Sequence, residues 1–103
     1  MKELEVIPVS WEVRRPEANE EERMLIDLRI VDRGKGSYAV TRGSHQTLNK
    51  KGQWEWERQP SSRSAAYKRR CRWDDFAEAE AAARRAYDGL RATYAYYLDK
   101  ENR

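Results

Sequence analysis

The residues best suited to chemistry lie in the middle third of the chain. Residues 33–73 hold eleven Lys and Arg and only two acids, Glu55 and Glu57, a local charge of about +9. Aromatic residues such as Tyr38 and Tyr67 lie among these cations. Cationic side chains neutralise phosphates, and aromatic rings stack on unpaired bases. The segment therefore predicts a surface that binds single-stranded nucleic acid or RNA.

The residues predicted to bind nucleic acid are cations that contact phosphates and two tyrosines that stack on bases. They are Arg42, Lys50, Lys51, Arg58, Arg63, Lys68, Arg69, Arg70, Arg72, Tyr38 and Tyr67. The alternative is that these cations are solvated, or neutralise the acids of residues 1–32, whose charge is about −4. The nucleic-acid hypothesis requires that the cations converge in space.

His45 and Cys71 are the single histidine and single cysteine of the chain, and both residue types serve in catalysis at neutral pH. We interpret His45, in a Gly- and Ser-containing turn, as a solvated loop residue. The arginines beside Cys71 would lower the pKa of an exposed thiol, but strand alternation favours a half-buried cysteine that points away from them. One His and one Cys do not complete a zinc site, and residues 33–37 lack the ending of a P-loop. We expect a non-catalytic protein without a metal or cofactor.

A long amphipathic helix is predicted over residues 74–98. Its start resembles a capping box, because Glu78 follows Asp75 by three residues. Apolar residues recur in steps of three and four along one stripe, at Phe76, Ala79, Ala83, Tyr87, Leu90, Tyr94 and Tyr97.

Such a helix would be roughly 37 Å long, longer than the strands that it covers. Its end is predicted to overhang the sheet and to form a protein-interaction or self-association surface. The alternative is that the N-terminal arm folds over this end within the monomer. The residues of the predicted surface are Tyr94, Tyr96, Tyr97 and Leu98.

Four alternating segments, 4–15, 24–32, 37–42 and 53–59, are predicted as strands. Residues 16–22 are expected to form an exposed acidic loop, 33–36 a turn, 43–52 a hairpin excursion, and 65–73 a short helical turn followed by extended chain. The order predicts an α+β domain, an antiparallel sheet of about four strands covered on one face by the C-terminal helix. Trp54 and Trp56 share a sheet face, either as core residues or as a stacking platform.

The length of 103 residues indicates a single domain, 1–103, in which residues 1–73 are mainly strands and loops and 99–103 form a mobile tail. The absence of a long apolar run predicts neither a signal peptide nor a membrane span. A lone cysteine agrees with a reducing compartment, so we expect a cytoplasmic protein.

A partial resemblance covers residues 48–86. The order Leu48-Asn49, Gly52, Trp54-Glu55, Pro60-Ser61-Ser62-Arg63, Arg70, Arg72-Trp73 and an Ala- and Glu-rich helix resembles small uncharacterised proteins of actinobacteria and their phages. The resemblance implies a phage or mobile-element accessory protein and assigns no role to any residue.

Two functional hypotheses follow. The first is a small nucleic-acid-binding accessory module that uses the basic middle segment. The second is a protein-binding effector that docks on a host protein complex through the helix end or a sheet edge, as a phage-encoded protein would. A homodimer formed through the helix end is compatible with either.

Overall fold

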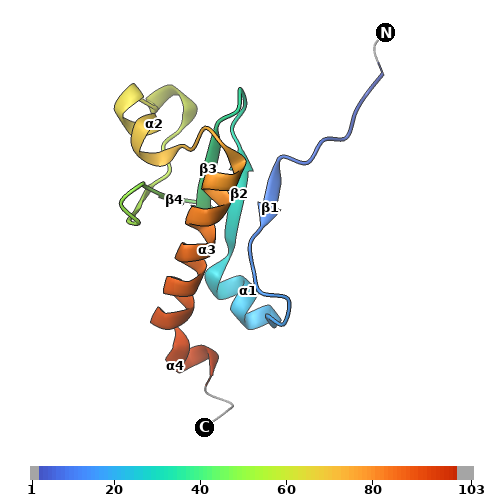
Figure 1. The fold of residues 1–103 in the computed structure, drawn as a ribbon, viewed down its shortest axis with the longest axis vertical. Coiled ribbons are helices and arrows are strands. Elements are labelled where there is room, and N and C mark those ends of the chain that lie inside the picture. Colours follow the sequence, from blue (N-terminus) through green and yellow to red (C-terminus); the bar gives the residue numbers. More distant parts are fainter. Residues whose placement is uncertain (1–2, 100–103) are drawn as a thin grey trace.

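Five short strands pair in chain order to form one antiparallel sheet, in a computed structural model that describes residues 3–99 (Figure 1). This arrangement confirms the α+β class, with one strand more than expected. The additional strand is β4, which pairs with both neighbours and places Thr47 opposite Thr41 and Glu55. The strands are β1 (Ser10–Glu12), β2 (Leu28–Asp32), β3 (Tyr38–Arg42), β4 (Gln46–Leu48) and β5 (Trp54–Trp56).

The long helix α3 (Phe76–Thr93) packs across β2 and β3 and closes the main core (Figure 1). The predicted apolar stripe is confirmed, since Ala79, Ala83, Tyr87 and Leu90 are all buried. Asp75 is the N-cap as expected, but its side chain makes no capping hydrogen bond, so the predicted capping box does not form. The facing sheet residues of this core are Leu28, Ile30, Val40 and Leu48.

The predicted helix over 74–98 is wrong at its C-terminal end, because α3 stops at Thr93 and a separate short helix, α4 (Ala95–Leu98), follows. Arg42 of β3 donates a 3.0 Å hydrogen bond to the Tyr94 hydroxyl and lies over the Tyr94 ring. These contacts tie Tyr94 to the sheet at the point where the chain leaves α3. With 18 residues, α3 is roughly 27 Å long, so the predicted overhang is much reduced.

Residues 16–22, expected as an exposed loop, instead lead into helix α1 (Glu20–Ile26). The Asn19 side chain accepts from the Glu22 backbone N–H at 2.9 Å and caps this helix. Glu22 is buried, and its carboxylate accepts hydrogen bonds from Arg15, Arg91 and the Tyr87 hydroxyl. A buried carboxylate at this position is stable because two guanidinium groups compensate its charge.

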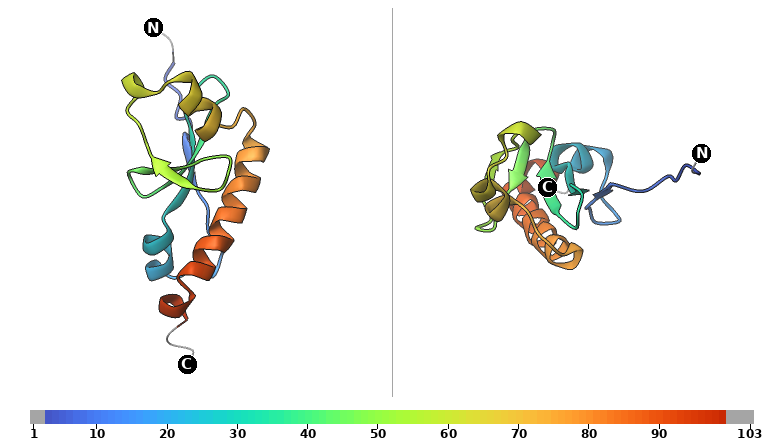
Figure 2. Two further views of the ribbon diagram at one scale, coloured as in Figure 1. Left: turned by 90° about the vertical axis from the view of Figure 1, so that its left-hand side faces the viewer. Right: turned by 90° about the horizontal axis from the view of Figure 1, so that it is seen from above.

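The first strand is shorter than the predicted 4–15. Leu4 and Val6 are fully exposed, and Ile7 and Val9 are 62% and 57% exposed. Figure 1 and the right-hand view of Figure 2 show this extended N-terminal arm, residues 4–9, projecting away from the helices and the sheet, to which the Val9 carbonyl is still joined by a 2.8 Å hydrogen bond from the Asp32 N–H. Pro8 has no N–H for a sheet hydrogen bond.

A second helix, α2 (Ala65–Cys71), follows the 3₁₀ turn η1 (Pro60–Ser62) and packs on the other face of the sheet. Side chains alternate along β5, so that Trp54 packs on the core beneath α3 while Glu55 bonds to Arg70 of α2. The predicted cover of one face by the long C-terminal helix is confirmed, and α2 adds a short helix on the opposite face at this end of the sheet (Figure 2).

Two remaining expectations concern the chain ends and the membrane. Residues 100–103 of the predicted mobile tail lie outside the described residues, whereas Asp99 accepts a hydrogen bond from Arg91 at 3.3 Å. Between residues 3 and 99, no helix is both long enough and apolar enough to span a membrane.

Candidate nucleic-acid interface

Two of the predicted phosphate-binding arginines, Arg72 and Arg63, pair with one carboxylate, that of Glu57, and so does Arg33, which was not predicted. Arg72 and Arg33 donate to it at 2.9 and 3.0 Å, and the Tyr67 hydroxyl donates a further hydrogen bond. Arg63 lies 4.0 Å from the same carboxylate. We call these five residues the Glu57 cluster. Its arginines stabilise the domain internally.

The electrostatics of the Glu57 cluster favour the charged state. Burial disfavours ionisation of Glu57, but the hydrogen bonds from Tyr67 and Arg72 outweigh it and lower the pKa of Glu57. Burial raises the pKa of the Tyr67 phenol, and the Glu57 carboxylate raises it further. The cluster is therefore an ionised carboxylate held by neutral tyrosine and charged arginine at neutral pH.

Glu55, on the same face of the sheet, holds another predicted arginine. Arg70 donates to both carboxylate oxygens at 2.9 and 3.0 Å, and the Asn49 amide donates at 2.9 Å. The Arg70 and Asn49 hydrogen bonds lower the pKa of Glu55 to about 2. Arg70 is thus neutralised within the domain.

Arg42 and Arg58 also have partners within the chain. Arg42 donates to the carbonyls of Leu25 and Ile26, where it fixes the end of α1 against β3. Arg58 places its guanidinium 5.8 Å from the centre of the Tyr67 ring while remaining exposed at the surface. Arg42 is therefore structural, whereas Arg58 retains an accessible charge.

The two tyrosines predicted to stack on bases are not presented to solvent as required. Tyr67 lies on the buried face of α2 and is 1% exposed, so the prediction that it stacks on a base is wrong. Tyr38 is half-buried and packs edge-on against Phe76. The accessible rings are instead those of β5, because Trp56 is 68% exposed and Trp54 is half-buried. The aromatic surface of this region is therefore Trp54 and Trp56.

The two residues considered for catalysis occupy different environments. His45 is exposed between β3 and β4, as expected, and its ring stacks on Trp56 with centroids 5.1 Å apart. Cys71 is completely buried at the end of α2 and not half-buried in a strand. Burial raises the pKa of the Cys71 thiol to about 11, so the thiolate population at neutral pH is very small.

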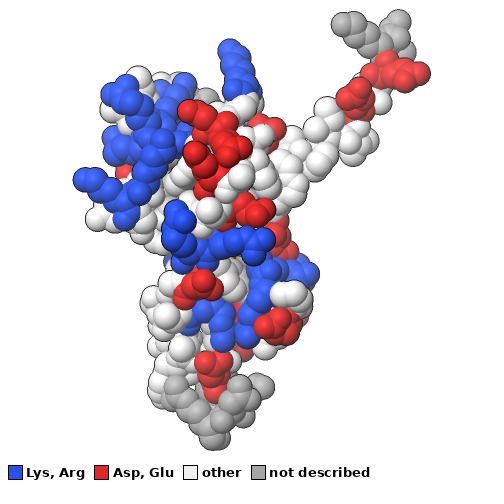
Figure 3. Space-filling model, in the orientation of Figure 1, with Lys and Arg blue, Asp and Glu red and all other residues white. Residues whose placement is uncertain are grey.

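Four of the predicted cations are exposed and lack a partner side chain in the described structure, and they lie on the β4–β5 turn and on α2, which are joined there. Their side chains make no hydrogen bond or ion pair with any other residue in the range 3–99, and we call them the lysine surface: Lys50, Lys51, Lys68 and Arg69. The Lys50 backbone N–H donates to the Arg70 carbonyl at 2.8 Å, which joins the turn to the helix. Figure 3 shows blue side chains gathered over α2, next to a separate acidic group.

A pocket of about 510 Å³ lies within this surface. Lys50, Lys51 and Arg69 line it, together with polar groups of Asn49 and Gln53. Glu55 also lines it, but that carboxylate is bonded to Arg70. The pocket therefore has the charge and hydrogen-bonding groups suited to a phosphate backbone.

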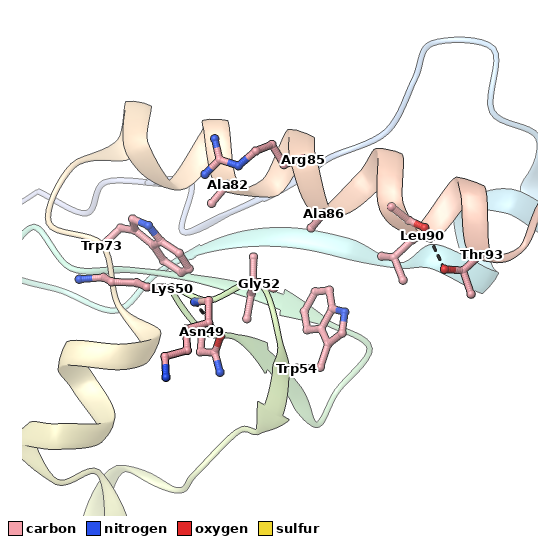
Figure 4. Close-up of a pocket in the computed structure, with 13 residues that line it drawn as sticks. Asn49, Lys50, Gly52, Trp54, Trp73, Ala82, Arg85, Ala86, Leu90 and Thr93 are labelled. Carbon is pink, nitrogen blue, oxygen red and sulfur yellow. Dashed lines mark hydrogen bonds between the residues drawn. The ribbon is translucent and has the colours of Figure 1, made fainter.

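A second pocket of about 540 Å³ lies between α3 and the β4–β5 hairpin, and we call it the tryptophan groove. Figure 4 shows the rings of Trp54 and Trp73 beneath α3, with Ala82 and Ala86 on the helix above them. Arg85, which the sequence prediction missed, joins Lys50 and Lys51 along the lining, and no acid lines the groove. Because Lys50 and Lys51 line both pockets, the two sites are continuous around the turn.

These features define a small α+β domain with a five-stranded antiparallel meander and a cationic surface beside tryptophan rings. No family model, curated protein or solved structure matches the chain. Among residues 3–99, no group of His, Cys, Asp and Glu side chains is arranged to hold a metal ion.

Proposed function

We propose that this protein is a small, non-catalytic, cytoplasmic module that binds single-stranded nucleic acid across the lysine surface. The supporting observation is that Lys50, Lys51 and Arg69 line one pocket and Lys68 is next to Arg69 in α2. All four are exposed and without an acidic partner in the described part of the chain, whereas neighbouring arginines are paired. A strand of nucleic acid brings the negative charge that this surface lacks.

The preference for single strands follows from the tryptophans of β5. Trp54 and Trp56 are two residues apart on one strand and so share a face, with their Cα positions about 7 Å apart. Unpaired bases stack on such rings without regard to sequence, while paired bases are inaccessible to them. Phosphates on the lysine surface and bases against β5 together favour single-stranded RNA or DNA over a duplex.

The test is binding of a labelled single-stranded oligonucleotide of about 20 nucleotides, measured by fluorescence anisotropy at low salt. Lys50→Gln is expected to weaken binding severalfold. Arg29→Gln removes the same charge from β2 at the end of the sheet beside α1, where Arg29 pairs with Asp27, and should leave affinity nearly unchanged. Undetectable binding by the wild-type protein, or equal losses in both variants, would contradict the proposal.

A second candidate function is a protein-binding effector, and the helix end favours it. Tyr96 and Tyr97 are 65% and 58% exposed and pack edge-to-face with centroids 5.5 Å apart, while Tyr94 and Leu98 pack against the core. Exposed tyrosines of this kind are enriched at protein interfaces. If the protein is a phage-encoded effector that docks on a host complex through this end, the host partner should still capture it after nuclease treatment. Tyr97→Ser should then abolish capture, and Lys50→Gln should not.

A further inference from the structure

The N-terminal arm and the tryptophan groove have complementary properties. The arm presents Leu4, Val6, Ile7 and Val9 to solvent along an extended segment, with Glu3 and Glu5 at its outer end. The groove presents Trp54, Trp73 and small side chains of α3 between cations, and it has no acidic lining residue. An apolar segment that carries acids suits a groove that combines apolar walls with cations.

The lengths also agree. Leu4 to Val9 spans about 17 Å in extended conformation. The stretch of α3 that lines the groove, from Ala82 to Thr93, spans about 16 Å. Figure 4 places Lys50, Trp73 and Arg85 at one end of the groove and Leu90 and Thr93 at the other. The acidic end of the arm would therefore lie at the cationic end of the groove, with Val9 toward Thr93.

The arm cannot readily fill the groove of its own chain. Residues 4–9 continue from β1, whereas the groove borders β5, and these strands are the opposite edges of the sheet. Four strand spacings separate the edges by about 19 Å. Figure 1 and the right-hand view of Figure 2 show the arm directed away from the sheet. The arm can reach the groove of a second copy without turning back across its own sheet.

We propose that, in the absence of nucleic acid, the arm of one copy docks in the tryptophan groove of a second copy, and that reciprocal exchange gives a closed dimer. The contact would place Leu4, Val6 or Ile7 against the tryptophan rings, and Glu3 and Glu5 beside Lys50, Lys51 and Arg85. Two identical exchanges related by a two-fold axis close the assembly at two chains.

This dimer would have a consequence for binding that rests on the proposed function. Lys50 and Lys51 belong to both the lysine surface and the groove. A docked arm would cover part of the phosphate-binding surface, so oligonucleotide and arm would compete.

The experiment is sedimentation velocity of the whole protein without nucleic acid, from low micromolar to several hundred micromolar. We expect the mass to rise from 12.2 kDa toward twice that value. The triple variant Leu4→Ser, Val6→Ser, Ile7→Ser should remain monomeric. Met24→Ser, which alters a side chain that is 73% exposed on α1, should dimerise like the wild type.

A charge exchange tests the orientation of the arm. Arg85→Glu and Glu5→Lys should each weaken the dimer severalfold, and the two together should restore it, because the pair is then reversed. Four results would overturn the proposal. The wild-type protein could stay monomeric, or the triple arm variant could still dimerise. Tyr97→Ser at the helix end could abolish the dimer, or the charge exchange could fail to restore it. None of these outcomes involves oligonucleotide, so the proposed function is tested separately.

Discussion

The paired arginines and the lysine surface lie within one short segment but differ in what they contact. Arg70 of α2 bonds to Glu55, and Arg72, just after the helix, bonds to Glu57, whereas Lys68 and Arg69 of α2 are exposed to solvent. Successive residues of an α-helix are rotated by about 100°. The neighbouring cations Lys68, Arg69 and Arg70 of α2 therefore lie on different faces of the helix. The comparison teaches that a local charge of about +9 overstates the charge offered to a ligand.

Removal of the Glu57 carboxylate, which pairs with buried Arg72, should have the largest effect, a loss of stability. Glu57→Gln leaves Arg72, which is 5% exposed, without its anion. The expected loss in free energy of unfolding is about 3–5 kcal/mol, measured by urea denaturation.

The matched control is Glu80→Gln, which removes the carboxylate of an exposed ion pair with Arg84 on α3. It should cost no more than about 0.5 kcal/mol. Similar small losses in both variants would show that the Glu57 cluster is not structural.

Acid should lower the stability of the protein by protonating the carboxylates that pair with Arg70 and Arg72. The pKa values of Glu55 and Glu57 are lowered in the folded protein, so the stability that they contribute is complete above the ordinary glutamate range. This stability is lost as the pH falls below about 4.5 and then through the lower pKa values of the folded protein. For Glu55 the folded pKa is about 2. Urea denaturation at neutral pH and at about pH 3 should show this loss, and Glu55→Gln should make it smaller. A stability that does not change with acid would contradict the ionised pairs.

Trp56, the more exposed tryptophan of β5, should contribute to nucleic-acid binding and little to stability. Trp56→Leu is expected to weaken binding of a single-stranded oligonucleotide about tenfold, because base stacking contributes about 1–3 kcal/mol. The free energy of unfolding should change by less than about 1 kcal/mol, since the ring is 68% exposed. Anisotropy and urea denaturation of the same preparation measure the two effects, and an unchanged affinity would exclude Trp56 from the interface.

Release of Arg70 from the Glu55 carboxylate should give the smallest effect of these changes. It should raise the affinity for the oligonucleotide, whereas Trp56→Leu lowers it. Glu55→Gln removes the only acid of the pocket on the lysine surface and leaves Arg70 exposed beside Arg69. One additional phosphate contact would raise affinity severalfold at low salt and steepen the salt dependence by about 0.7. A weaker affinity after this substitution would mean that Arg70 must be held in place for binding.

The sequence predicted the class of fold and the core stripe of α3, because apolar periodicity reports directly on a buried face. It failed for residues 16–22, where the three consecutive acids that suggest a loop instead occupy the first turn of α1. Glu22 is buried there through Arg15 and Arg91, and no local pattern reveals a partner 69 residues away. The end of α3 was missed for a similar reason, since Tyr94 is held by Arg42 from a distant strand.

For the candidate site, the sequence located the cations but could not separate those with partners from those without. Strand alternation could have indicated that Glu55 and Glu57 face away from Trp54 and Trp56. It could not place α2 on that face, which is what pairs Arg70 and Arg72 and buries Tyr67. Arg85 enters the groove only because α3 crosses beside the β4–β5 hairpin.

The most direct test is the salt dependence of oligonucleotide affinity for the wild type and for a variant with Lys50, Lys51, Lys68 and Arg69 all replaced by Gln. The wild type should lose affinity with a slope of about −3 in a plot of log affinity against log salt, since each single-strand phosphate contact contributes about −0.7. The variant should fold normally and show almost no slope. An undiminished slope in the folded variant would contradict the assignment of binding to these four side chains.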